Sequence, residues 1–75
     1  MYRIKHVSKL GNDIAYSIEY KTFFKTYDII IYHDESLNTW DGTIIEYGSW
    51  RDLTHDEIMD IIKEVLSDVI RYVCL

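Results

Sequence analysis

The chain has 75 residues, of which 48% are hydrophobic and 15% aromatic, and it carries a formal net charge of −5. This apolar content excludes a disordered acidic tail, and the length predicts a single small globular domain over residues 1–75. The one cysteine excludes an intramolecular disulfide, and no apolar run approaches the ~20 residues of a membrane-spanning helix. Because the first residues show no signal-peptide pattern, we expect a cytoplasmic protein without membrane contact.

The charge is unevenly distributed along the chain. Residues 1–27 carry five lysines and arginines against two carboxylates, whereas residues 28–75 carry eleven carboxylates against three cations. We therefore expect a folded molecule with one basic and one acidic region.

A first β-hairpin is predicted around segment 11–13, because the residues on both sides of it alternate between apolar and polar side chains. A three-residue loop would place Leu10 opposite Ile14 and keep the apolar side chains on one face. A two-residue loop would place Lys9 opposite Ile14 and mix the two faces. We therefore predict the three-residue loop, with His6 on the inner face and a solvated, mostly basic outer face.

A second turn is required between residues 14 and 33, although this segment contains no Gly, Pro or Asn. Twenty extended residues at ~3.3 Å each would outrun a domain of this size. A four-residue loop over 22–25 pairs Tyr20 with Tyr27 and keeps the inner faces aligned. This loop places two phenylalanines at the tip of the hairpin, between lysines.

The third predicted strand, residues 27–33, is apolar on both faces and is therefore expected at the centre of the sheet. Turn-forming residues follow, including Asp41-Gly42, and the pattern leaves two alternatives for residues 34–42: one long loop or a short extra hairpin. A fourth strand is predicted over residues 43–47. Residues 48–53 are predicted to connect it to a helix.

The C-terminal helix has the clearest boundaries in the sequence. Thr54 and Glu57 have the spacing of a capping box, and Leu53 is placed to pack against Ile58 as a hydrophobic staple. Apolar residues then recur every three or four positions to the end of the chain at Leu75: Ile58, Ile62, Val65, Val69 and Val73. The predicted fold class is α+β, a four-stranded, mostly antiparallel β-meander with one C-terminal α-helix packed across one face (ββββα).

Catalytic and metal-binding patterns are weak. The triplet His-Asp-Glu occurs at 33–35 and at 55–57, but the second is the acidic first turn of a capped helix and the first is a polar loop. No H-E-x-x-H motif, paired cysteines or glycine-rich phosphate loop is present, and Cys74 lacks an activating pattern. We therefore predict no enzymatic activity, no catalytic residue, no metal and no cofactor.

The predicted surface instead favours binding to another protein. One helix covers one face of a sheet, which leaves outward apolar residues and two flanking tryptophans exposed. A row of carboxylates on the helix has spacing that could imitate the charge of nucleic acid. The residues assigned to partner binding are Phe23, Phe24, Ile30, Tyr32, Trp40, Ile44, Trp50, Asp60, Glu64 and Asp68.

The leading functional hypothesis is a non-catalytic protein-binding module, a small acidic regulator or inhibitor. In size and charge the chain resembles the small inhibitors that phages and mobile elements direct against host nucleic-acid enzymes and defence systems, including anti-CRISPR proteins and DNA mimics. One alternative is nucleic-acid binding by the basic hairpin, which the net negative charge disfavours. The residues of that alternative are Arg3, Lys5, Lys9, Lys21 and Lys25. Another alternative is a homodimeric structural subunit.

Overall fold

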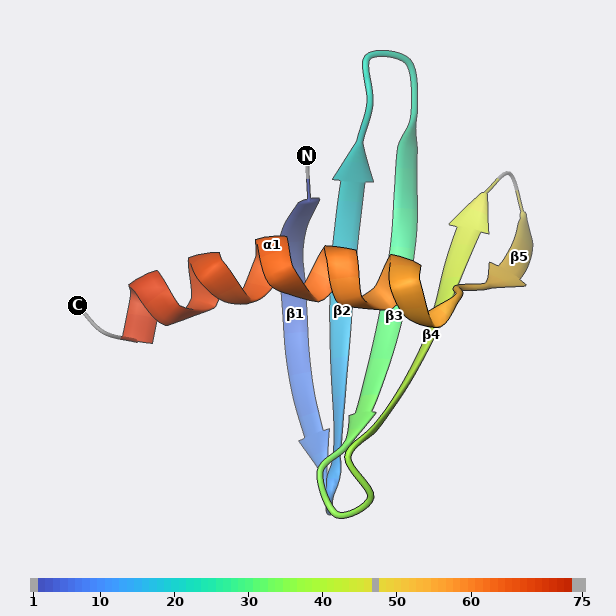
Figure 1. Cartoon of the computed structure of the whole chain (residues 1–75). Helices are drawn as coiled ribbons and strands as arrows, with labels where there is room; N and C mark the ends of the chain where they lie inside the picture. Colours follow the sequence, from blue (N-terminus) through green and yellow to red (C-terminus); the bar gives the residue numbers. More distant parts are fainter. Residues whose placement is uncertain (1, 47, 74–75) are drawn as a thin grey trace.

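The computed structural model of the chain describes residues 2–46 and 48–73, with side chains up to residue 65. Its strands are β1 (Tyr2–Leu10), β2 (Asp13–Lys21), β3 (Thr26–Asp34), β4 (Thr39–Glu46) and β5 (Ser49–Asp52), and its helix is α1 (His55–Val73). The strands form one antiparallel sheet in the order β1-β2-β3-β4-β5, and α1 lies across one face of it (Figure 1). The α+β class is confirmed, with five strands where four were predicted.

The additional strand is β5, in the segment that the sequence predicted as a connection to the helix. Gly48 adopts a left-handed conformation with φ of 77°, and the Ser49 hydroxyl donates a hydrogen bond to the carbonyl of Glu46 at 2.9 Å. Glycine tolerates this conformation without strain, so the chain can reverse here. Trp50 then pairs with Ile45 as the strand runs back along β4.

The first hairpin has a two-residue loop, so the prediction of a three-residue loop was wrong. Lys9 lies opposite Ile14 in the register, as the rejected alternative required. The register shifts by one residue between Ile4 and His6, and this β-bulge reverses the facing of the side chains that follow it. His6 therefore lies on the outer face and is exposed, not on the inner face as predicted.

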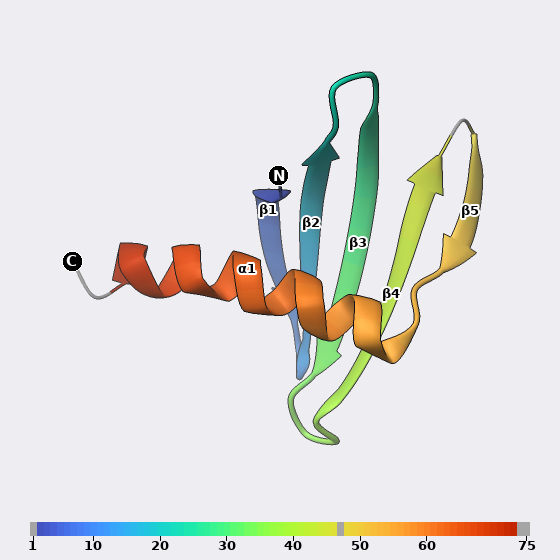
Figure 2. The same cartoon turned by 45° about the horizontal axis from the view of Figure 1, so that its top comes forward.

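The second hairpin has the predicted register and loop. Tyr20 pairs with Tyr27, and the strands end where Lys21 pairs with Thr26. The hydroxyl of Thr22 accepts hydrogen bonds from the backbone N–H groups of Lys25 at 3.1 Å and of residue 24 at 3.4 Å. This bonding orders the loop, and the hairpin tip projects beyond the neighbouring strands (Figures 1 and 2).

The connection between β3 and β4 is a four-residue turn over 35–38, so neither predicted alternative for residues 34–42 is correct. The Asp34 carboxylate accepts hydrogen bonds from the backbone N–H of Ser36 at 2.9 Å and of Leu37 at 3.2 Å. Asn38 completes the turn with φ of 51°. Because β4 begins at Thr39, residues 41 and 42 lie within a strand and form no turn.

The helix begins with the predicted capping box. The Glu57 carboxylate accepts a hydrogen bond from the N–H of Thr54 at 3.0 Å, and the N–H of Glu57 donates to the Thr54 hydroxyl at 3.2 Å. The helix then crosses the strands and buries its apolar face against the middle of the sheet (Figure 1). The buried core consists of Ile18, Ile29, Ile31, Ile58, Ile61, Ile62 and Val65.

The helix backbone continues past β1, where no described strand lies beneath it (Figures 1 and 2). The predictions for Asp68, Val69, Val73 and Cys74 lie outside the described residues or side chains. No helix in the described ranges is both long and apolar enough to span a membrane.

Candidate protein-interaction surface

The sheet has one face covered by α1 and one face on which none of the described elements packs; we call the second the outer face (Figure 2). Ile30 and Tyr32 project from β3 on the outer face, as predicted, because they alternate with the buried Ile29 and Ile31. The prediction for Ile44 was wrong. It pairs with Ile29 and packs against the core on the helix side.

Ile45 takes the outward position predicted for Ile44, and it completes a continuous apolar stripe. Ile45 pairs with Trp50 on β5 and lies diagonal to Ile30, which is followed on the same strand by Tyr32. Tyr32 in turn pairs with Ala15 on β2. We name these five residues, Ala15, Ile30, Tyr32, Ile45 and Trp50, the outer stripe.

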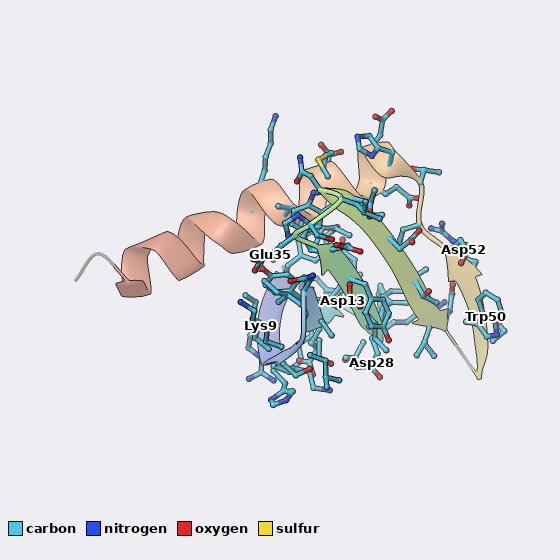
Figure 3. The ribbon with its side chains drawn as sticks, turned by 90° about the horizontal axis from the view of Figure 1, so that it is seen from below. Lys9, Asp13, Asp28, Glu35, Trp50 and Asp52 are labelled. Carbon is cyan, nitrogen blue, oxygen red and sulfur yellow. The ribbon has the colours of Figure 1, made fainter. Side chains whose placement is uncertain are left out.

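The outer stripe is exposed to solvent at its largest side chains. Trp50 is 69% exposed, Tyr32 49% and Ile45 37%. Trp50 was predicted in a loop, but it stands on β5 at the edge of the sheet opposite β1 (Figure 3). A strand holds a tryptophan in a defined orientation, which suits an anchor at a protein interface.

Carboxylates border the outer stripe. Asp28 pairs with Ile45 in the register, Asp41 with Tyr32, and Asp52 with Thr43, so all three carboxylates share the outer face with the stripe. Figure 3 labels Asp28 and Asp52. Asp28 forms an ion pair with the Lys5 ammonium at 3.3 Å. The outer face is therefore apolar along its diagonal and mainly acidic around Tyr32 and Trp50.

The hairpin tip presents a second apolar contact. Phe23 is 99% exposed and Phe24 90%, and their ring centroids are 6.1 Å apart. Since Thr22 orders the loop beneath them, both rings are displayed by a defined turn. Their position at the tip between lysines was predicted.

Trp40 lies elsewhere than predicted. It is part of β4 on the helix side of the sheet, where it packs against the core, and does not lie in an exposed loop. The His33 ring stacks on it with centroids 3.8 Å apart and an interplanar angle of 8°, and Tyr16 stacks at 6.4 Å. His33 Nε2 also lies 3.1 Å from the Asn38 amide oxygen. These contacts give Trp40 a packing role.

The helical carboxylates differ in their surroundings. Asp60 and Glu64 are exposed, as predicted, and the side chain of Asp68 lies outside the description. Glu57, which belongs to the same row, is held by the Arg51 guanidinium through contacts of 3.0 and 3.1 Å. This bidentate pair neutralises one charge of the row and weakens its likeness to a regular series of phosphates.

The ion pair between Arg51 and Glu57 changes the pKa of the Glu57 carboxyl group. The hydrogen bonds from Arg51 and from the Thr54 N–H lower the pKa of Glu57 from 4.5 to about 2. A lowered pKa means that this carboxylate stabilises the fold fully above pH 4.5 and loses its contribution as the pH falls towards 2. Because the side chain is 37% exposed, solvent screening limits the contribution to about 1 kcal/mol or less.

We expect Arg51→Gln to return the pKa of Glu57 towards 4.5, measured by NMR titration of its side-chain carboxyl carbon. Arg3→Gln is the matched control, because it breaks the 3.3 Å ion pair with Glu19 and leaves Glu57 untouched. An unchanged Glu57 pKa in Arg51→Gln would show that the cap alone sets it.

The basic residues of the nucleic-acid alternative are distributed over both faces and face carboxylates. Ion pairs join Arg3 to Glu19 at 3.3 Å, Lys5 to Asp28 at 3.3 Å, Lys9 to Glu35 at 3.7 Å and Lys25 to Glu46 at 3.9 Å. A phosphate backbone would have to compete with these carboxylates for the cations.

The two His-Asp-Glu triplets stay apart. One spans the end of β3, with His33 and Asp34 in the strand, and the other forms the first turn of α1. Among the described residues, no group of three or more His, Cys, Asp or Glu side chains is arranged to hold a metal ion.

The fold and these surfaces define a small α+β protein with a five-stranded antiparallel meander, one crossing helix and an uncovered sheet face. Searches with this chain against protein-family models, curated proteins and solved structures find no match.

Proposed function

We propose that this chain is a non-catalytic protein-binding module, a small acidic regulator or inhibitor, that contacts its partner through the outer face of the sheet. The observation that carries the proposal is the outer stripe. It combines a tryptophan that is 69% exposed with a half-exposed tyrosine and two isoleucines on one rigid surface. Large aromatic side chains near the centre of an interface supply most of its binding energy.

The charges around the outer stripe indicate the chemistry of the partner. Asp41 and Asp52 favour a surface with basic residues around an apolar centre, and charge complementarity would speed association with it. Enzymes that act on nucleic acids present basic surfaces, so a host enzyme of this kind is the partner class that we favour. Phe23 and Phe24 supply a second contact at the hairpin tip.

The double variant Trp50→Ala/Tyr32→Ala is expected to weaken partner binding at least about tenfold, because it removes both aromatic anchors of the outer stripe. The partner is first captured from lysate by photo-crosslinking through a probe at position 43, which lies on the outer face. The affinity of the purified pair is then measured by calorimetry.

Leu37→Ala is the matched control, because Leu37 is 72% exposed but lies in the turn between β3 and β4. It should leave affinity unchanged. Equal affinity for the wild type and the double variant would contradict the proposal. If the cross-linked partner is a second copy, and Tyr32→Lys converts a sedimenting dimer to a monomer, the homodimeric alternative replaces it.

A further inference from the structure

A pocket of about 250 Å³ lies between α1 and the sheet, on the face opposite the outer stripe. Three isoleucines give the pocket an apolar lining: Ile29 and Ile44 from the sheet and Ile61 from the helix. The rings of Tyr2 and Tyr20 form one wall, with centroids 4.6 Å apart and an interplanar angle of 31°. We name this cavity the tyrosine pocket.

Carboxylates from the helix also line the pocket. Glu57 and Asp60 line the tyrosine pocket, and Glu64 follows Asp60 one helical turn later. Arg51 also lines the pocket, but its guanidinium is bound to both carboxylate oxygens of Glu57 at 3.0 and 3.1 Å. The charge of that pair is balanced, so Asp60 gives the pocket lining its negative character.

The titration of Tyr2 is consistent with a negative potential in the pocket. Burial raises the pKa of the Tyr2 phenol, and the neighbouring Tyr20 and the carboxylates of Glu64, Asp60 and Glu57 raise it further. Burial opposes a charge of either sign, but the carboxylates that oppose a phenolate anion favour a bound cation.

We propose that the tyrosine pocket binds an organic cation with an apolar stem, that is, a guanidinium or alkylammonium group. The isoleucine side chains suit the methylene groups of such a ligand, and the Tyr2 ring, which packs on Tyr20 and lines the same pocket, suits its cationic head. Asp60 supplies opposite charge in the lining of the pocket, and Glu64, one helical turn beyond it, adds to the negative potential at Tyr2. Because the pocket and the outer stripe lie on opposite faces, this inference does not depend on the proposed function.

Ligands of this chemistry have two sources: a free amine or guanidine, and the lysine or arginine side chain of a polypeptide. Butylguanidinium tests the first source and N-acetylarginine amide the second, while butylurea is a neutral probe of nearly the same shape. For probes of this size we expect dissociation constants on the order of 1–10 mM. Both cations should shift the ring signals of Tyr2 and Tyr20 in NMR spectra, and butylurea should not.

Two variants test which groups bind the probe. Asp60→Asn/Glu64→Gln should weaken butylguanidinium binding about fivefold, since both carboxylates are exposed and screened. Asp13→Asn/Asp41→Asn makes the same change in net charge on the outer face and should leave binding within about twofold of the wild type. Tyr2→Leu keeps the carboxylates but removes one ring, and should weaken binding about threefold.

Binding of both cations supports the proposal and indicates a polypeptide side chain as ligand, whereas binding of butylguanidinium alone supports it and indicates a free cation. Equal shifts with butylurea would overturn the proposal. So would equal losses of affinity in the two charge variants, because the attraction would then come from the net charge of the molecule. The amide spectrum of each variant, recorded in the same titration, reports whether its fold is intact.

Discussion

Val65→Asp is expected to abolish cooperative folding. Val65 is 2% exposed and lies in the core that α1 forms with the sheet, so the variant would bury a carboxylate without a partner. Such a group costs several kcal/mol whether it stays charged or takes up a proton, against a total stability of about 4–11 kcal/mol for a chain of this length. Urea denaturation followed by circular dichroism measures the loss.

Two controls separate burial from helix propensity. Glu64→Asp places aspartate at the neighbouring, exposed position of the same helix and should change stability by about 0.5 kcal/mol or less. Val65→Ala removes only methyl groups and should leave a folded protein that is about 1–3 kcal/mol less stable. A Val65→Asp variant with a urea midpoint near that of the wild type would contradict the position of the helix on the sheet.

The sequence predicts the second hairpin and the helix cap well because both depend on local signals. Alternation on the two strands permits a register in which Ile18 faces Ile29, and this pair became part of the core. Thr54 and Glu57 are three residues apart, and their reciprocal hydrogen bonds need no information from elsewhere in the chain.

The first hairpin shows why local alternation can mislead. A β-bulge adds one residue to a strand and exchanges its two faces, and no residue type near Lys5 marks it in the sequence. With the bulge, a two-residue loop at 11–12 is compatible with an inward Ile4. Without the bulge, the same loop would place Ile4 on the outer face. The prediction therefore chose the three-residue loop, which keeps Ile4 on the inner face.

The candidate surfaces were predictable only in part. The exposure of Phe23 and Phe24 follows from their place in the loop at the hairpin tip, and that of Tyr32 from its strand position. Ile44 and Ile45 are adjacent and identical in type, so only pairing with β3 decides which one faces outward. The tyrosine pocket depends on where the helix crosses the sheet, and periodicity alone does not determine that position.

Gly42 has a packing role in β4 that the sequence alone does not indicate. Next to Asp41 it has the composition of a turn, yet it is buried in β4. A Cβ atom on Gly42 would lie 2.9 Å from Leu53 Cδ1, 3.2 Å from Ile58 Cγ1 and 3.3 Å from Ile31 Cγ1. The Gly42 carbonyl also accepts a hydrogen bond from the Leu53 N–H at 2.8 Å, which holds the start of the helix close to the strand.

We therefore expect Gly42→Val to destabilise the fold by about 1–3 kcal/mol, although valine is a better strand former than glycine. The urea midpoint measures the change. Thr43→Val introduces the same residue at the next position, on the outer face, and should be neutral or stabilising. Leu53→Ala removes the nearest obstructing atom, so its cost should be smaller in the Gly42→Val background than in the wild type by at least about 0.5 kcal/mol. Strictly additive effects would show that Leu53 and the strand are not in close contact.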